Sequence, residues 1–138
     1  MLSKADLQKL AQIRLEDSVH LLQTNRASSA YYLCGYAVEL ALKACIAKLI
    51  QPDIIPEKAF INAIYTHNFD SLVSIAGLLP QLQADIKADT EFAAYWAIAT
   101  KWSEDSRYEF WDSVSAATML QAMYDPDHGV FQWVKKHW

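Results

Sequence analysis

The sequence predicts an all-α protein, and three observations carry this prediction. Only three Gly and four Pro occur among 138 residues, so the chain lacks the residues that the many tight turns of a β-fold require. Apolar residues recur at helical spacing, and strand-like alternation never extends beyond a few positions. The length suits one domain, residues 1–138. We therefore expect an antiparallel up-and-down helical bundle of four to five main helices.

Composition narrows the classes of function. Hydrophobic residues make up 53% of the chain and charged residues 20%, which excludes a disordered protein. No run reaches the ~18 consecutive apolar residues of a membrane span, and the N-terminus carries charges where a signal peptide would be apolar. We therefore expect a cytoplasmic protein without a membrane partner. The net charge of −4 argues against binding nucleic acid by overall charge, which leaves a local basic patch open.

The two longest predicted helices come first in the chain. Ser3 followed by Asp6 is typical of a capping box and begins a helix that we expect to run to about residue 23. Asn25 is expected to cap the next helix, which spans about residues 26–50. This second helix is apolar nearly all round, as is typical of the central helix of a bundle.

Shorter helices are expected along the rest of the chain, where residues that commonly cap helices recur. They are a short stretch at 57–65, a helix between Asn68 and Gly77, a short one at 81–88, one from Asp89 to about Trp102, and one after Asp112 or Ser113. Residues 103–111 are interpreted as a structured loop. The Asp-Pro-Asp motif at 125–127 predicts the start of a last helix. Its tryptophans and basic residues either pack and complement the helix dipole, or form an exposed tail that suits RNA or a partner protein.

A polar stripe interrupts the apolar second helix. Gly35, Glu39 and Lys43 are spaced by four residues, so they share one helix face. Glycine inside a helix costs about 1 kcal/mol relative to Ala, so we expect another helix or a ligand to approach closely at Gly35. Glu39 and Lys43 are oriented favourably for an ion pair. Either they form a solvated pair only, or the stripe lines a cleft in which Glu39 holds Arg107 or Arg14.

Three segments follow one another along the chain: a helix core with Ala30, Gly35, Tyr36, Glu39, Leu42, Lys43 and Ala44, then His67 with Leu72, then Trp102 with Arg107 and Tyr108. In their order and spacing these segments resemble the HEPN family. The resemblance covers about residues 26–124. It implies a four- or five-helix up-and-down bundle that forms a homodimer. It also implies a toxin–antitoxin, defence or RNA-processing setting, in which members cleave RNA without metal, bind nucleotides or pair with a nucleotidyltransferase.

The chain departs from the family at the ribonuclease motif, Arg-x(4–6)-His. The corresponding arginine is Arg107, but the next histidine is His128, too far along the chain. Arg14 and His20 match the spacing formally, yet they lie inside the first helix about 120° apart. We therefore expect a non-catalytic or atypical HEPN-like module that binds RNA or a nucleotide, or pairs with a nucleotidyltransferase.

The residues expected around one cleft are Glu39, Lys43, Arg107 and Tyr108. Arg107 follows two acids, Glu104 and Asp105, so it is either a salt-bridged anchor of its loop or a phosphate contact beside a stacking Tyr108. In the second case Glu39 would orient Arg107.

His67 is interpreted either as a residue that locks a loop or as a proton-transfer group. An alternative function is therefore a metal-independent endoribonuclease with Arg107 and His67 as candidate catalytic residues, or with His128 in place of His67. A further alternative is a purely structural dimerisation or adaptor module. We expect no metal site, since no second His or Cys stands at ligand spacing from His67, and no cofactor.

Overall fold

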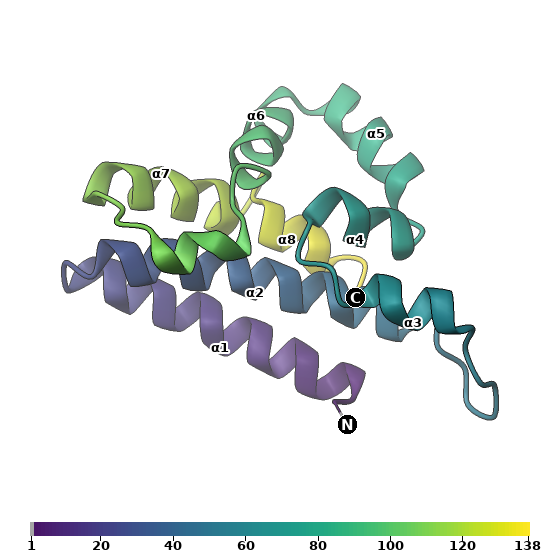
Figure 1. Ribbon diagram of the computed structural model, residues 1–138. Coiled ribbons are helices and arrows are strands. Elements are labelled where there is room, and N and C mark those ends of the chain that lie inside the picture. Colours follow the sequence, from purple (N-terminus) through teal and green to yellow (C-terminus); the bar gives the residue numbers. More distant parts are fainter. Residues whose placement is uncertain (1) are drawn as a thin grey trace.

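The computed structural model describes residues 2–138 and consists of helices and their connections (Figure 1). Within that range no strand occurs, so the all-α prediction is confirmed. The α-helices are α1 (Lys4–Gln23), α2 (Ala27–Ala47), α3 (Lys58–Ile64), α4 (Phe69–Ile75), α5 (Leu79–Ala88), α6 (Thr90–Ala99), α7 (Ser113–Tyr124) and α8 (Val130–Lys135), and the 3-10 helix η1 (Glu104–Tyr108) lies between α6 and α7.

The two longest helices, α1 and α2, form an antiparallel hairpin (Figure 1). The predicted capping box is present: Ser3 Oγ accepts a hydrogen bond from the Asp6 amide, and Asp6 Oδ2 accepts one from the Ser3 amide. The prediction that Asn25 caps α2 is wrong. Asn25 takes the left-handed conformation, with φ of 62°, which asparagine tolerates better than most residues. It therefore turns the chain after α1, and Arg26 occupies the cap position of α2.

Helix α2 is the centre of the core. It packs against α1, α4, α7, α8 and η1, and most of its residues are buried. Its thiols Cys34 and Cys45 are free and buried, and this burial raises both pKa values, that of Cys45 to about 11. By length and composition α2 is a candidate membrane span, but most of that segment is buried inside the fold, as the core helix of a bundle would be.

The close approach expected at Gly35 is confirmed, and the approaching group is Trp102. The indole lies so near that a methyl group on Gly35 would overlap it. Trp102 Nε1 donates a hydrogen bond to the Tyr32 carbonyl at 3.2 Å, and its ring stacks on Phe69 of α4 with centroids 5.3 Å apart. Trp102 therefore ties α2 to α4 and to the segment that enters η1.

The last helix begins later than predicted. Asp125 Oδ1 accepts hydrogen bonds from the amides of Asp127 and His128 at 3.0 and 2.8 Å, so this carboxylate closes a turn. Helix α8 begins at Val130, after Gly129. A side chain on Gly129 would overlap the backbone of Asp125. Only glycine therefore fits at this position of the tight turn before the helix.

The tryptophans of the C-terminal helix do not form an exposed tail. Trp133 is 6% exposed and packs against Phe92 and Trp96, with ring centroids 5.5 and 6.0 Å away. Trp138 meets Phe131 edge-on at 5.9 Å. Packing, rather than an exposed aromatic surface, is therefore the role of these rings.

Candidate functional site

A buried carboxylate on α2 is the starting point of the candidate site. Glu39 is 1% exposed. Its Oε1 accepts hydrogen bonds from Lys43 Nζ at 2.9 Å and from the His67 ring, whose Nδ1 lies 2.8 Å away. A buried ionised carboxylate needs such partners because its removal from water is costly. The predicted Glu39–Lys43 ion pair is confirmed, and it lies largely inside the protein rather than in solvent.

His67 connects Glu39 to a second carboxylate. Its Nε2 lies 2.8 Å from Glu104 Oε2. A ring with both nitrogens at hydrogen-bond distance from carboxylate oxygens can donate to both only when it carries two protons. The side chain of His67 is 39% exposed, so part of the imidazole is accessible to solvent.

Glu104 in turn holds Arg107, one turn further along η1. Arg107 Nη1 donates to Glu104 Oε1, so the salt bridge to an acid of the same loop, which one of the two interpretations predicted, is present. The guanidinium carbon of Arg107 lies 4.8 Å from the centre of the Tyr108 ring, a cation–π distance. Tyr108 itself is 75% exposed. We refer to Lys43, Glu39, His67, Glu104 and Arg107, in that order, as the charged network.

Two local features position the histidine and Glu104. Asn68 caps α4 by accepting a hydrogen bond from the Ser71 amide at 2.9 Å, which holds His67 just before the helix. Trp102, stacked on Phe69, fixes the chain just before Glu104. Between these two features lies an open hollow of about 240 Å³, lined by His67, Asn68, Trp102, Ser103, Glu104 and Asp105.

The network joins the predicted site residues in a way that the sequence did not predict. Glu39 contacts neither arginine that was expected: Arg107 is bound by Glu104, and Arg14 pairs with Asp17 at 3.8 Å. His67 is the connection that was missed. Its contact with Glu39 spans 28 positions of the chain, and no local spacing signals a contact of that range.

Three buried side-chain atoms within residues 2–138 meet no hydrogen-bond partner, namely Glu39 Oε2, Ser106 Oγ and Trp111 Nε1. An unpaired buried polar group costs about 1–3 kcal/mol, so folded proteins retain few of them. Glu39 belongs to the charged network, Ser106 lies in η1, and Trp111 follows η1 by three residues. One of the three groups therefore belongs to the charged network, and another lies in the 3-10 helix that carries Arg107.

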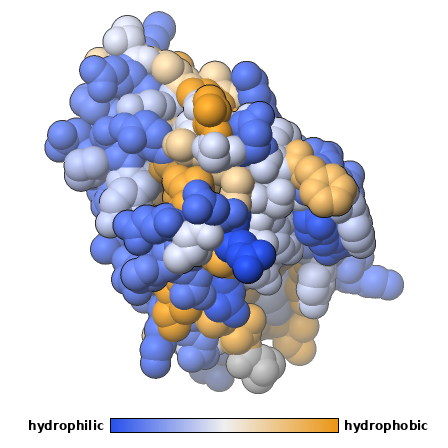
Figure 2. All heavy atoms as spheres, turned by 90° about the vertical axis from the view of Figure 1, so that its left-hand side faces the viewer, coloured by the Kyte–Doolittle hydropathy of each residue, from blue (hydrophilic) through white to orange (hydrophobic). Residues whose placement is uncertain are grey.

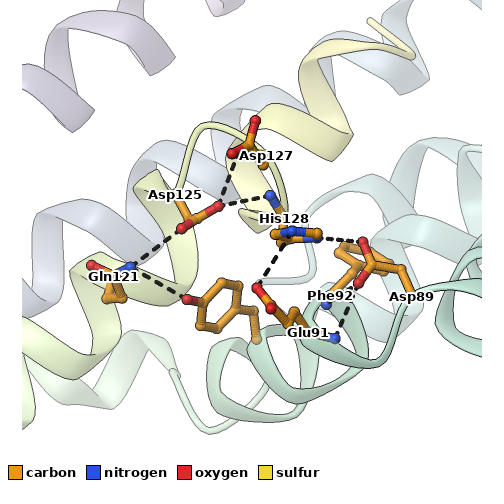
Figure 3. Close-up of polar contacts among 8 residues, drawn as sticks. Asp89, Glu91, Phe92, Gln121, Asp125, Asp127 and His128 are labelled. Atoms are coloured by element: carbon orange, nitrogen blue, oxygen red, sulfur yellow. Dashed lines mark hydrogen bonds and ion pairs between the residues drawn. The ribbon is translucent and has the colours of Figure 1, made fainter.

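A second histidine between carboxylates lies outside the charged network. His128 Nδ1 is 2.6 Å from Asp89 Oδ2, and His128 Nε2 is 3.4 Å from Glu91 Oε2 (Figure 3). The hydrogen bond to Asp89 raises the pKa of His128, and the same bond lowers the pKa of Asp89. Of the two histidines considered as replacements for the missing motif residue, the structure links His67 to Arg107 and ties His128 to a different part of the surface.

Among residues 2–138, no group of three or more His, Cys, Asp or Glu side chains is placed to hold a metal ion. Comparison with protein-family models, curated proteins and solved structures found no match to this chain.

Proposed function

We propose that this protein is a HEPN-like helical module that binds RNA or a nucleotide at Arg107 and Tyr108. The observation that carries the proposal is the anchoring of this exposed pair to the core. Glu104 holds Arg107, His67 holds Glu104, and the buried Glu39 of α2 holds His67. An arginine held in this way loses little freedom when it contacts a phosphate, so binding costs less conformational entropy.

The charges of the network suit an anion. With two protons on His67, the five groups alternate in sign along the network and sum to one positive charge. The cation at the exposed end is Arg107, whose planar guanidinium can donate two parallel hydrogen bonds to phosphate oxygens. A phosphate placed there would complete the alternation of charge.

The exposed aromatic rings suit a base. Tyr108 packs against the guanidinium of Arg107 and is 75% exposed, and Phe110 is fully exposed two residues later. Stacking of a base on an aromatic side chain contributes about 1–3 kcal/mol and tolerates any base. A phosphate contact beside a stacking ring is the minimal arrangement for one nucleotide.

The wider setting follows from the resemblance of residues 26–124 to the HEPN family. It includes a homodimer, a toxin–antitoxin or defence context, and pairing with a nucleotidyltransferase. None of these is needed for the binding step itself, which depends on Arg107, Tyr108 and their anchors.

Fluorescence anisotropy with a labelled single-stranded RNA tests the proposal, with a mononucleotide as competitor. We expect Arg107→Ala to weaken binding roughly tenfold or more, since a hydrogen bond to a charged group contributes about 1.5–3 kcal/mol. Tyr108→Ala should weaken it about fivefold or more through lost stacking. Affinity should fall with added salt, because phosphate contacts release counterions.

Arg14→Ala is the matched control, because Arg14 is also paired with an acid three residues away. The RNA affinity of Arg14→Ala should equal that of the unmodified protein. Equal losses in Arg14→Ala and Arg107→Ala, or no binding at low salt, would overturn the proposal. Affinity that does not change with salt would instead favour the structural adaptor.

One observation favours a second function, a metal-independent endoribonuclease. Glu104 contacts both the His67 imidazole and the Arg107 guanidinium, and His67 and Glu104 line one open hollow. Glu104 would take the proton of a ribose 2′-hydroxyl, whose oxygen attacks the adjacent phosphorus. His67 would give its Nε2 proton to the departing 5′-oxygen, and Arg107 would stabilise charge on the phosphoryl oxygens. The products are a 2′,3′-cyclic phosphate and a free 5′-hydroxyl.

Incubation of the protein with structured RNA in EDTA tests this second function. We expect cleavage to be lost in His67→Ala and Glu104→Gln and retained in His128→Ala. Loss of cleavage in Arg107→Ala without loss in His67→Ala would contradict the mechanism. Binding without cleavage would leave the first function standing and exclude the second.

A further inference from the structure

A hollow of about 350 Å³ lies among α5, α6, α8 and the turn between α7 and α8. It shares no lining residue with the hollow beside His67. The ionisable side chains that line it are three carboxylates, two imidazoles and one ammonium group, from Asp85, Asp89, Asp127, His128, His137 and Lys136. Binding sites for small molecules occupy about 300–1,000 Å³ and combine apolar walls with a few convergent polar groups. The volume and the lining of this hollow therefore fit a small ligand.

Two aromatic rings form the apolar wall of the hollow. Phe92 of α6 and Trp133 of α8 are 3% and 6% exposed, and their ring centroids lie 5.5 Å apart. Because both rings are packed in the core, the wall is already in place before a ligand arrives. On the face at the α1–α2 turn, seen in Figure 2, hydrophobic residues are instead scattered among hydrophilic ones. The hollow thus joins an apolar wall to a charged lining.

Asp85 is oriented by two hydrogen bonds. Trp133 Nε1 donates to its Oδ2 at 2.7 Å, and Gln81 Nε2 donates to its Oδ1 at 3.0 Å. These bonds lower the pKa of Asp85, and the nearby His137 and Lys136 lower it further, so the carboxylate is ionised near neutral pH. An ionised carboxylate can accept about four hydrogen bonds. Asp85 therefore keeps acceptor positions for a ligand.

Asp89 and His128, in contrast, are already engaged with each other (Figure 3). Asp89 Oδ2 lies 2.6 Å from His128 Nδ1, and Asp89 Oδ1 accepts hydrogen bonds from two amides at the start of α6. The bond to Asp89 raises the pKa of His128, which favours a protonated ring whose charge offsets that of Asp89. Asp127, one residue before His128, is exposed. The carboxylates that remain for a ligand are therefore those of Asp85 and Asp127.

The charge of the lining favours a cation. Burial lowers the pKa of His137, so its ring carries no charge near neutral pH. With His128 protonated, the three aspartates outweigh the two cations, Lys136 and His128, by one negative charge. Glu91 and Asp125 lie close enough to His128 to raise its pKa further, and they add two negative charges beside the hollow. Such surroundings attract an ammonium or guanidinium group and repel a phosphate or a carboxylate.

We propose that this hollow binds a small organic cation, an ammonium or guanidinium group on an apolar body. The cationic group donates hydrogen bonds to the carboxylates of Asp85 and Asp127, and the apolar body packs against Phe92 and Trp133. Attraction between a cation and the indole ring adds to the binding. The site has the opposite charge preference to the one proposed at Arg107, and neither site depends on the other.

An NMR titration of the isotope-labelled full chain with benzylamine tests the proposal. Benzyl alcohol and benzoate are matched probes, since they place a neutral and a negative group on the same ring. We expect benzylamine to bind roughly tenfold or more tightly than benzyl alcohol, the effect of a hydrogen bond between charged groups, and benzoate to bind more weakly still. The reporter is the indole N–H of Trp133, which donates to Asp85. Its resonance should shift, while those of Trp102 and Trp111, which lie outside the hollow, should not.

Two substitutions test the carboxylates. Asp85→Asn should weaken benzylamine binding roughly tenfold. Asp127→Asn should weaken it about threefold, because an exposed charge is partly screened by water. Asp127 is on the surface, so its substitution leaves the fold intact even if Asp85→Asn disturbs the contact with Trp133. Asp70→Asn is the matched control, since Asp70 is an exposed aspartate that does not line the hollow, and it should bind benzylamine as the unmodified protein does.

Four outcomes would overturn the proposal. They are no shift of the Trp133 resonance at millimolar benzylamine, equal affinities for benzylamine and benzyl alcohol, preference for benzoate, and equal losses in Asp127→Asn and Asp70→Asn. A blocked lysine, N-acetyl-lysine methylamide, that binds more tightly than benzylamine would replace the small molecule with a protein side chain. Arg107→Ala should leave benzylamine binding unchanged, so failure here is distinguishable from failure of RNA binding.

Discussion

Two histidines in this protein each lie between two carboxylates, and their surroundings differ. His67 connects Glu39, whose side chain is 2% exposed, to Glu104. His128 connects Asp89 and Glu91, whose side chains are 34% and 66% exposed. Where one carboxylate is buried, the histidine forms an anchored site. Where both carboxylates face solvent, His128 of the α7–α8 turn connects to Asp89 and Glu91 at the start of α6, and we call these three residues the surface clasp (Figure 3). Burial of one partner is what separates the two.

The largest expected effect comes from removing the buried carboxylate. Glu39→Ala leaves Lys43 and His67 without their shared partner, and breaking a buried pair in this way costs about 3 kcal/mol. Urea denaturation measures the loss in the free energy of unfolding. Glu39→Gln, which keeps the side-chain volume and one acceptor, should lose less. A negligible loss in Glu39→Ala would remove the distinction between the two histidines.

The next largest effects are expected from substituting Gly35, near the His67 site, and Gly129, near His128. Gly35→Ala forces a methyl group against Trp102, and Gly129→Ala forces one against the backbone of Asp125. Each should lower the free energy of unfolding by about 2 kcal/mol through overpacking. Only Gly35→Ala should also weaken RNA binding, because a displaced Trp102 would shift Glu104, which holds Arg107. Equal RNA affinities in the two folded variants would show that the position of Trp102 does not matter to the site.

A smaller loss of stability is expected on substitution of Asp89, which both caps α6 and contacts His128. Asp89 accepts hydrogen bonds from the amides of Glu91 and Phe92 at the start of α6 and also meets His128. Asp89→Ala should cost about 1 kcal/mol, the usual loss for a helix N-cap. Thermal unfolding followed by circular dichroism measures it. A loss as large as that of Glu39→Ala would mean that the surface clasp matters as much as the buried anchor.

The smallest effect is the pH dependence of the clasp. The pKa of His128 is raised in the folded state, chiefly by its hydrogen bond to Asp89 and further by Glu91 and Asp125. The protonated ring therefore stabilises the fold fully below its unfolded pKa of about 6.5, and this contribution is lost as pH rises through the folded value. The difference in unfolding free energy between the unmodified protein and His128→Gln should shrink from about pH 5 to about pH 9. A constant difference would contradict the assignment.

Local features of the fold were predicted well because they depend on neighbouring residues. The caps at Ser3, Asn68 and Asp112 follow from side chains that bond the amide three residues on. Asn25 and Asp125 were misassigned for one reason: both residue types serve equally in caps and in turns. Which role each takes depends on backbone conformation, which the packing of the flanking helices sets.

In the candidate site, too, the local contacts were predicted from the sequence and the long-range contacts were not. The pairs Glu39–Lys43 and Glu104–Arg107 lie one helical turn apart, and the sequence pointed to both. The contacts of His67 with Glu39 and Glu104 join different elements, so no spacing predicts them. Without these contacts the two pairs would be separate salt bridges rather than one network.

The sequence by itself determined the all-α class, the central position of α2 and the polar stripe with its unusual Gly35, because helix geometry within one or two turns dictates them. Only the tertiary structure decided that Trp102 covers Gly35, that His67 joins two ion pairs, and that Ile55 and Ile61 stay exposed. Periodicity states which face of a helix avoids water. It does not state which segment meets that face, because that depends on how all the helices pack together.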